Sequence, residues 1–360
     1  MKSTPTVLAH ILLYHSNTAS VKRCIESVLG QADYSRANLK VLVTDNASKS
    51  QGLDELEEYF GERITIRRQP VNLGYCGGHN AACAEFLAST FDVFLVLNPD
   101  LMLMSDVFQE VMSSMHADSA IGTATIKLRR ADENLNPLVP ETVDAAGMIM
   151  TSSLRHFDRG SGEPDGGTFT HNEFVFAGTG ACLFMKRAFV EDALLRGKNH
   201  EDDVLMVYPE LRDGLYARAP LFDESFFAYR EDAELGWRAQ TLGWKCLYVG
   251  NACGHHVRVV TPERRKHLPA LLNRLSVRNR FLMQAVHFSP VNLNCLISGF
   301  LIRNLIVIIG VLLFERASFG AFKEVALLWR RSMERRRILK KRRRVHAFEV
   351  MKQFTSNFHE

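Results

Sequence analysis

Two adjacent carboxylates, Glu231 and Asp232, stand where an aromatic segment ends and a helical pattern begins. Asp232 shares one helical face with the apolar residues Leu235, Ala239 and Leu242. This spacing predicts that Asp232 lies in the first turn of a helix and points toward the interior or a cleft beside it. A carboxylate in that position can take a proton from a bound hydroxyl group. The alternative is that both acids only complement the positive end of the helix dipole.

The rest of this helix has its own signals. Gly243 stands where a glycine commonly ends a helix. Glu234 and Arg238 are four residues apart on another face, so we expect them to pair in solvent.

The N-terminal third alternates short apolar runs with helical patterns, which predicts a mostly parallel sheet covered by helices on both faces. Ligands bind such sheets beyond the carboxyl ends of the strands. Polar clusters around His15, Asp45 and Asp100 stand at those ends. The predicted strands are 7–13, 39–43, 64–68, 93–97 and 121–128, and the predicted helices are 21–29, 53–60, 105–116 and an alanine-rich one ending at Leu87.

Each polar cluster has a chemical interpretation and a plainer one. Asp45 could contact a nucleoside base or ribose, or form a turn with Asn46. The glycine-rich segment 72–80 could approach a phosphate, or pack a helix tightly. Asp100 could hold a divalent cation, or serve as a turn residue after Pro99.

The middle of the chain, residues 129–176, is rich in Gly, Asp, Asn and Pro and predicts a long functional or disordered loop. A small-residue segment, 178–182, follows and could present backbone N–H groups to a substrate, or allow close packing of the backbone. The adjacent histidines His255 and His256 follow a strand predicted at 245–249, in what we expect to be a loop, and could include a metal ligand.

Together these motifs resemble family 2 glycosyltransferases of the GT-A fold, most closely the bacterial rhamnosyltransferases. The resemblance covers about residues 7–285. Two positions depart from the family pattern: Leu13-Tyr14-His15-Ser16 stands where the family usually has Thr-Tyr-Asn, and Asn98-Pro99-Asp100 replaces Asp-x-Asp. The family resemblance rests on the motifs Asp45-Asn46-Ala47-Ser48, Asn72-Leu73-Gly74 with Gly77-Gly78, Leu97-Asn98-Pro99-Asp100, Gly178 to Ala181, Glu231-Asp232 with Trp237-Arg238, and His255.

The resemblance implies inverting transfer of a sugar, with L-rhamnose from dTDP-rhamnose as the leading donor, to a hydroxyl of a cell-envelope glycan or polyprenol-linked acceptor. It implies Asp232 as the catalytic base with Glu231 as the substitute, and Mg²⁺ or Mn²⁺ held by Asp100 and His255. Residues that would bind the nucleotide-sugar are Tyr14, Asp45, Asn72, Gly74, Gly77, Gly78 and Asn98; residues on the acceptor side are Gly178, Thr179, Gly180 and Trp237.

Composition separates the C-terminal region from the rest. The chain has 360 residues, of which 46% are hydrophobic, and a net charge of +4. Residues 330–344 carry ten Lys or Arg and one Glu, which leaves the remaining chain at −5. We expect a glycosyltransferase domain at 1–264 and a helical, partly apolar and basic region at 265–360. Apolar residues interleaved with this basic run predict a helix lying on an anionic membrane surface. The alternative is a helical appendage packed on the catalytic domain or across a homo-oligomer.

The first six residues are polar and no secretion signal is expected, and the seven scattered cysteines form no C-x-x-C pair. The predicted location is therefore the cytoplasm, with peripheral attachment to the cytoplasmic face of the membrane. No helix-turn-helix or zinc pattern accompanies the basic run, so nucleic acid is not an expected partner. Two other functions stay open: a nucleotidyltransferase acting on sugar phosphates, and an inactive module that binds nucleotide-sugars or glycans.

Overall fold

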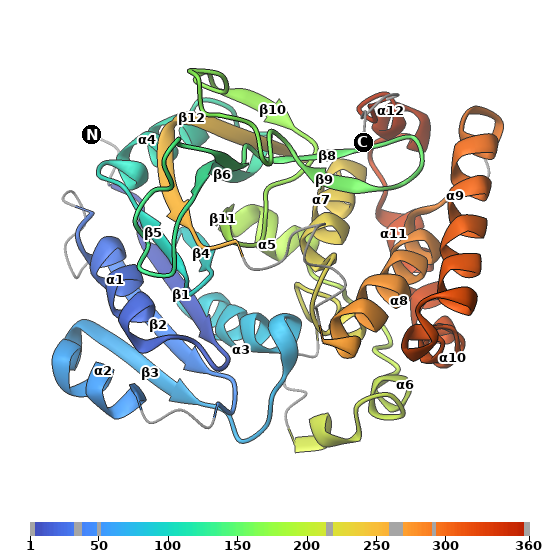
Figure 1. Ribbon diagram of the computed structural model, residues 1–360, viewed down its shortest axis with the longest axis horizontal. Helices are drawn as coiled ribbons and strands as arrows, with labels where there is room; N and C mark the ends of the chain where they lie inside the picture. The colour runs from blue at the N-terminus through green and yellow to red at the C-terminus, as the bar shows by residue number, and fades with distance from the viewer. Residues whose placement is uncertain are drawn as a thin grey trace.

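A ten-stranded sheet forms the centre of the molecule, in the order β10-β12-β6-β11-β4-β1-β2-β3, with β5 beside β12 and β7 beside β6 (Figure 1). The structure is a computed structural model and describes residues 4–31, 38–48, 52–213, 219–258, 269–289 and 293–355. Strands β3, β2, β1 and β4 pair in parallel, as do β6 and β12, while β11 is antiparallel to both of its neighbours. The carboxyl ends of β1, β2 and β4 therefore lie at one edge of the sheet.

The strands are β1 (Val7–Leu13), β2 (Leu39–Asp45), β3 (Ile64–Arg68), β4 (Val93–Leu97), β5 (Leu101–Leu103), β6 (Ile121–Arg130), β7 (Val143–Ala145), β8 (Met148–Met150), β9 (His156–Asp158), β10 (Glu173–Val175), β11 (Cys182–Lys186) and β12 (Lys245–His256). The helices are α1 (Thr18–Leu29), α2 (Gly52–Phe60), α3 (Gly74–Ala88), α4 (Val107–His116), α5 (Arg187–Ala193), α6 (Glu201–Leu205), α7 (Glu231–Thr241), α8 (Ala270–His287), α9 (Leu293–Leu313), α10 (Gly320–Leu327), α11 (Trp329–Arg342) and α12 (Ala347–Met351).

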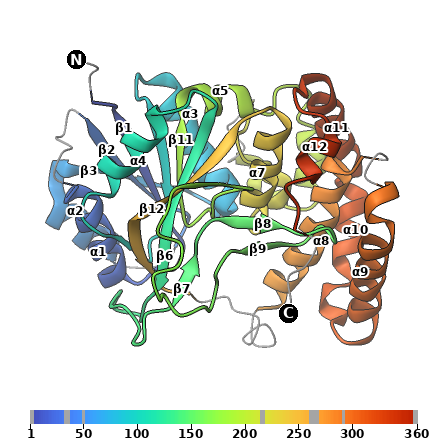
Figure 2. The ribbon, with the colours of Figure 1, turned by 90° about the horizontal axis from the view of Figure 1, so that it is seen from above.

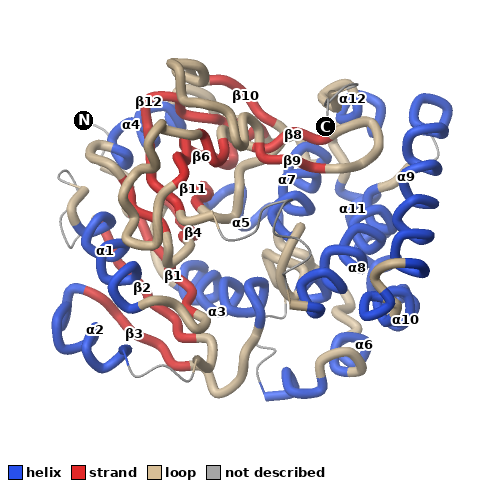
Figure 3. The backbone as a smooth tube through the Cα atoms, viewed as in Figure 1, coloured by secondary structure: helices blue, strands red, loops and turns tan. Residues whose placement is uncertain are grey.

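Two apolar layers cover the sheet, because residues along each strand alternate between its faces. In β1, Val7, Ala9 and Ile11 pack with α1, α2 and α4, whereas Leu8 packs with α3 on the other face. The second layer continues through α5 and α7 to the C-terminal helices, which lie together on one side of the sheet (Figures 2 and 3). The predicted α/β fold with helices on both faces is confirmed. The predicted loop at 129–176 contains four short strands, β7 to β10.

The C-terminal helices are joined to the α/β body by buried ion pairs. Arg331 and Arg335 of α11 are fully buried; Arg331 contacts Asp223 at 3.2 Å and Glu224 at 3.2 Å, and Arg335 contacts Asp223 at 3.5 Å. Two of the ten basic residues are therefore internal, as the packing alternative expects, whereas six remain exposed: Arg330, Arg337, Lys340, Lys341, Arg343 and Arg344. Three further arginines pair with the same body: Arg330 with Asp203, and Arg342 and Arg344 with Asp192. The predicted domain boundary at 264/265 falls outside the described residues.

Helix α9 presents an apolar face to solvent. Leu301, Ile302, Leu305, Ile306 and Ile309 are each 43–58% exposed, and Phe314, just after the helix, is 83% exposed. The polar Asn304 points the other way and bonds to Arg280 and Gln284 of α8. Within the described residues no single helix is long and apolar enough to span a bilayer. Two consecutive helical segments, 299–313 and 316–327, together have the length and apolar composition of a membrane span, but they are bent by 112° relative to each other.

Candidate active site

Two adjoining cavities open where β1, β2 and β4 end. The larger one, about 1000 Å³, is bounded by the ends of β1 and β4, the start of α3, and α8. The smaller one, about 510 Å³, is bounded by the start of α7 and the end of β12. Six residues line both cavities, so a molecule in one can meet a molecule in the other: Tyr75, Asn98, Asp100, Ala228, Tyr229 and Val257.

The predicted base contact, Asp45, is turned away from the larger cavity. It is buried, and its carboxylate accepts a hydrogen bond from the backbone N–H of Ser48. Its neighbour Asn46 lines the cavity instead. Tyr14 and Asn72 also line it, and Tyr14 is 51% exposed. The structure therefore corrects the position of Asp45 and adds Asn46 to the residues that line the cavity.

Asn46 holds the entrance to α3 in place. Its amide nitrogen donates to Asn72 Oδ1 at 2.8 Å and to the Gly74 carbonyl at 3.1 Å, and its oxygen accepts from the Leu73 N–H at 2.8 Å. Gly74 has a φ of 67°, and a Cβ there would lie 2.4 Å from the Phe227 carbonyl oxygen. Only glycine accommodates this close approach without strain.

Gly77 and Gly78 do not line either cavity. A Cβ on Gly77 would lie 2.7 Å from the Leu73 side chain, and one on Gly78 would lie 2.5 Å from Leu12 of β1. Both residues are buried in α3 and allow the helix to pack closely on its surroundings. The predicted nucleotide contacts at these two positions are corrected to helix packing.

Asp100 projects into the space between the two cavities and lines both. Its Oδ1 atom is buried and has no hydrogen-bond partner among the described residues. His256 Nε2 lies 3.6 Å from Asp100 Oδ1 and 3.3 Å from Asn98 Nδ2. The predicted ligand His255 does not line either cavity, because adjacent residues of β12 point to opposite faces of the sheet. His256 therefore replaces His255 as the histidine beside Asp100.

A second carboxylate fixes the orientation of His256. Asp144 Oδ2 lies 2.8 Å from His256 Nδ1, and Arg258 Nη1 lies 3.1 Å from Asp144 Oδ1. Burial alone would lower the pKa of His256, but the hydrogen bond to Asp144 and the negative charges of Asp144 and Asp100 raise it to about 10. A histidine that binds metal through one nitrogen usually bonds a carboxylate through the other. A cation at Nε2 would have to displace the proton held there.

Asp232 lies at the start of α7 in the wall of the smaller cavity. Its Oδ2 accepts from the Gly180 N–H at 3.0 Å and its Oδ1 accepts from the Ala233 N–H at 2.7 Å. Burial raises the pKa of Asp232, against the lowering effect of these N–H groups. The neighbouring Glu231 is buried, and burial and the charge of Asp232 raise its pKa well above the usual value.

The segment before Asp232 has an unusual backbone. Phe227, Tyr229 and Arg230 all have positive φ, between 61° and 70°. Each such residue stores about 1–3 kcal/mol of strain. Asn279 of α8 holds this segment: its Nδ2 lies 2.9 Å from the Phe226 carbonyl, 2.8 Å from that of Ala228 and 2.7 Å from that of Tyr229. Sequence analysis gave Asn279 no role.

Of the predicted acceptor-side residues, Thr179 and Gly180 line the smaller cavity. Gly178 does not; a Cβ there would lie 2.6 Å from Leu183, so it serves close packing. Trp237 is buried on the opposite side of α7, where its ring stacks on His287 at 5.0 Å. The predicted acceptor contacts of Gly178 and Trp237 are therefore corrected to packing contacts.

The Glu234–Arg238 ion pair of α7 lies in a different environment from the one predicted. Glu234 and Arg238 pair as predicted, at 2.5 Å, but the pair is buried rather than in solvent, because α8 covers this face and His287 contacts Glu234 at 2.9 Å.

Comparison with known proteins identifies the family. The model of "Glycosyl transferase family 2" matches residues 10–189, which is half of the chain. The chain belongs to glycosyl transferase family 2. A search of curated proteins gave no match. The match ends before Asp232, so the family assignment rests on the sheet, the glycine segment and the Asp100 region rather than on α7.

Solved structures agree with the family assignment at the level of the fold. A GalNAc-T7 structure with UDP, GalNAc and Mn²⁺ has a TM-score of 0.59 at 12% identity and covers 98% of this chain. Staphylococcus aureus TarS has a TM-score of 0.50 at 14% identity and covers 94%. The family 2 chain spans only 59% of the GalNAc-T7 chain and 52% of the TarS chain.

Proposed function

We propose that this family 2 chain transfers a sugar from a nucleotide-sugar to an acceptor hydroxyl, with inversion at the anomeric carbon. One observation carries the proposal: the Asp232 carboxylate lines a cavity that adjoins a larger one through Asp100 and Tyr75. We assign the larger cavity to the nucleotide-sugar and the smaller one to the acceptor. A single displacement needs this arrangement, since the attacking hydroxyl and the leaving group must lie on opposite sides of the reacting carbon.

Asp232 is the proposed base. Each of its oxygens already accepts one backbone N–H bond, so a lone pair on either oxygen remains for an acceptor hydroxyl. As that hydroxyl oxygen attacks the sugar, its proton passes to the carboxylate. The raised pKa of Asp232 favours this transfer, because a base works best when its pKa is close to the working pH.

Glu231 is the alternative base and is less suited. Its pKa is raised further, which favours the protonated form that cannot accept a proton. It also lies deeper, at 6% exposure. We assign it a structural role at the head of α7.

Asp100 and His256 would hold a divalent cation. The buried, unpartnered Oδ1 of Asp100 and the carboxylate-oriented imidazole of His256 fit Mg²⁺ or Mn²⁺, with donor phosphate oxygens and water completing the shell. Such an ion would offset the negative charge that develops on the leaving nucleoside diphosphate. The Mn²⁺ in the GalNAc-T7 structure supports this assignment. Within the described residues no group of three or more His, Cys, Asp or Glu forms a metal site, so the substrate has to supply ligands.

The donor and acceptor are proposed by resemblance. We propose dTDP-L-rhamnose as donor and a glycan of the cell envelope, carried on a polyprenol lipid, as acceptor. The UDP in the GalNAc-T7 structure supports a nucleoside diphosphate in the larger cavity but leaves the sugar open.

A panel of nucleotide-sugars tests these assignments. Release of a nucleoside diphosphate with a new glycosidic bond of inverted configuration is the expected result. Pyrophosphate release would instead indicate nucleotidyl transfer, and binding without turnover would indicate a binding module; either result overturns the proposal.

Peripheral attachment to the cytoplasmic face of the membrane is also a proposal. The exposed apolar face of α9 and the exposed Phe314 support this attachment. Helix α11 supports it less, because most of its arginines form ion pairs. Arg316 and Lys323, which follow α9 in the chain, are exposed and suit anionic headgroups.

Charged residues on the apolar face of α9 test this attachment. The double substitution Leu305→Glu with Ile309→Glu places two negative charges on that face and should abolish co-sedimentation with anionic vesicles. Wild-type protein that ignores such vesicles at low salt would contradict the attachment.

A further inference from the structure

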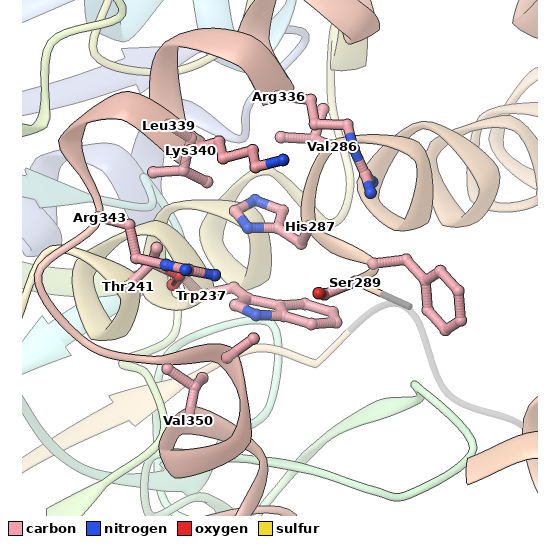
Figure 4. A pocket seen from close by; sticks show the side chains of 12 residues that line it. Trp237, Thr241, Val286, His287, Ser289, Arg336, Leu339, Lys340, Arg343 and Val350 are labelled. Carbon is pink, nitrogen blue, oxygen red and sulfur yellow. Dashed lines mark hydrogen bonds between the residues drawn. The ribbon is translucent and has the colours of Figure 1, made fainter. Parts of the chain in front are cut away.

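A third cavity lies away from the two substrate cavities and shares no lining residue with them. It has a volume of about 90 Å³ and is bounded by α7, α8, α11, α12 and the segments that follow α8 and α11. A cavity needs only about 10–15 Å³ to hold one water molecule, so this one can hold a small polyatomic ion. Figure 4 shows its polar side chains gathered around the ring of His287.

The lining of this cavity is positively charged. Arg336, Lys340 and Arg343 contribute three cations, and no Asp or Glu lines the cavity. Among the described residues, neither Lys340 nor Arg343 pairs with a carboxylate, in contrast to Arg331 and Arg335 on the same helix. Arg336 donates to the Ala285 carbonyl at 3.0 Å, so Lys340 and Arg343, both exposed, are the cations at this cavity that remain free to meet an anion.

His287 supplies a second, independent observation. Its side chain is 1% exposed, and its Nε2 lies 2.9 Å from Glu234 Oε1. Burial raises the pKa of Glu234, but Arg238 and His287 lower it below its usual value, so the carboxylate is ionised and Nε2 carries the hydrogen. The other ring nitrogen, Nδ1, is buried with no hydrogen-bond partner among the described residues. Burial also lowers the pKa of His287, so the ring is neutral and Nδ1 is a hydrogen-bond acceptor. Buried polar atoms of this kind are rare without a partner, so Nδ1 points to an unseen donor, such as the hydroxyl of a protonated phosphate.

The remaining walls suit a compact anion. Trp237 stacks on one face of the His287 ring, and in Figure 4 the Lys340 amine is drawn on the other side of that ring. Ser289 adds a hydroxyl group to the lining. Arginine forks and lysine ammonium groups together satisfy the several oxygens of a phosphate better than the two oxygens of a carboxylate.

We propose that this cavity binds one phosphate group, carried either by a lipid headgroup or by a soluble phosphorylated compound. The inference does not depend on the proposed sugar transfer, because none of the residues involved lines a substrate cavity. A ligand in this cavity would contact His287. Because His287 contacts Glu234 of α7, the ligand would be linked to the helix that begins beside the proposed base.

The test compares the thermal unfolding of full-length protein in sodium phosphate and in sodium chloride of the same ionic strength. Phosphate should raise Tm, by roughly 5 °C at a hundredfold excess over Kd. Lys340→Ala should weaken phosphate binding about tenfold or more, as expected for a charge-assisted hydrogen bond. Lys341→Ala is the matched control: it removes the same charge from the next residue, which is exposed and does not line the cavity, and should leave the shift unchanged.

Vesicles distinguish the two sources of the phosphate group. Binding to phosphatidic acid vesicles that free phosphate displaces, and that Lys340→Ala weakens more than Lys341→Ala, would identify a headgroup. A phosphate-dependent Tm shift that is lost in Lys340→Ala, without such vesicle binding, would identify a soluble compound. Equal unfolding in phosphate and chloride, or equal shifts in the two lysine variants, would overturn the proposal.

Discussion

Asn279 gives the sharpest prediction about how the C-terminal helices serve the active site. Its side-chain nitrogen lies within 2.9 Å of the carbonyls of Phe226, Ala228 and Tyr229, just before Asp232. Asn279→Ala removes this donor. Arg278 Nη2 still donates to the Phe226 carbonyl at 2.8 Å, so two carbonyls lose a partner.

The expected size of the effect comes from these contacts. An unsatisfied buried carbonyl costs about 1–3 kcal/mol, so the loss of a partner at two carbonyls should lower the free energy of unfolding by roughly 2–6 kcal/mol. The strained residues Phe227, Tyr229 and Arg230 can then relax toward ordinary backbone angles. A shift of about 1 Å in a catalytic group can cost about 10²-fold, so we expect kcat to fall roughly 10–100-fold with a smaller change in the donor KM.

Two further variants separate positioning from stability. Asn279→Asp keeps the shape but sets a carboxylate against the same carbonyls, so it should lose more activity than Asn279→Ala. Asn304→Ala removes an amide that bonds to Arg280 and Gln284 of the same helix α8, away from the strained segment. It should lose stability with kcat unchanged. Steady-state kinetics and urea unfolding measure both quantities. Folded Asn279→Ala with wild-type kcat, or Asn279→Asp as active as wild type, would refute the reasoning.

Three other predictions concern the metal, the entrance to α3 and acid stability. Chelation should abolish transfer and Asp100→Ala should mimic it, because the leaving group then loses its counter-charge; full activity in excess chelator would exclude the assignment. Gly74→Ala should lower both stability and donor affinity, since its Cβ would meet the Phe227 carbonyl at 2.4 Å; calorimetry with the donor measures this, and unchanged binding would contradict it. Burial lowers the pKa of His10 from 6.5 to about 3. Between these values the unfolded chain binds more protons than the folded one, so the free energy of unfolding should fall as pH drops below about 6.5. The urea midpoint of His10→Asn should therefore change less with pH than that of the wild type, and identical pH profiles would count against this prediction.

Local sequence patterns predicted much of the framework. The bounds of β1, β3 and β4 agree with the structure, because each is a short apolar run between polar turns. The start of α7 at Glu231 and the positive φ of Gly243 after it also agree with the helix signals. These features depend on residues close together in the chain, which is why periodicity and end signals were sufficient.

The remaining site features depend on contacts between distant segments. The choice between His255 and His256 depends on the register of β12, which shifts between Val249 and Cys253 and continues through both histidines. Asn279 contacts a segment about 50 residues earlier, and only the fold brings them together. The Glu234–Arg238 pair is buried because α8 covers it, and no pattern within α7 could reveal that.

The turnover of Asp232→Asn tests the central claim most directly. The substitution keeps the size of the side chain and removes its basicity, so the protein should fold and bind its donor as the wild type does. We predict that kcat falls about 10²–10⁴-fold, the usual contribution of a general base. A correctly folded Asp232→Asn enzyme with near wild-type kcat would contradict the account.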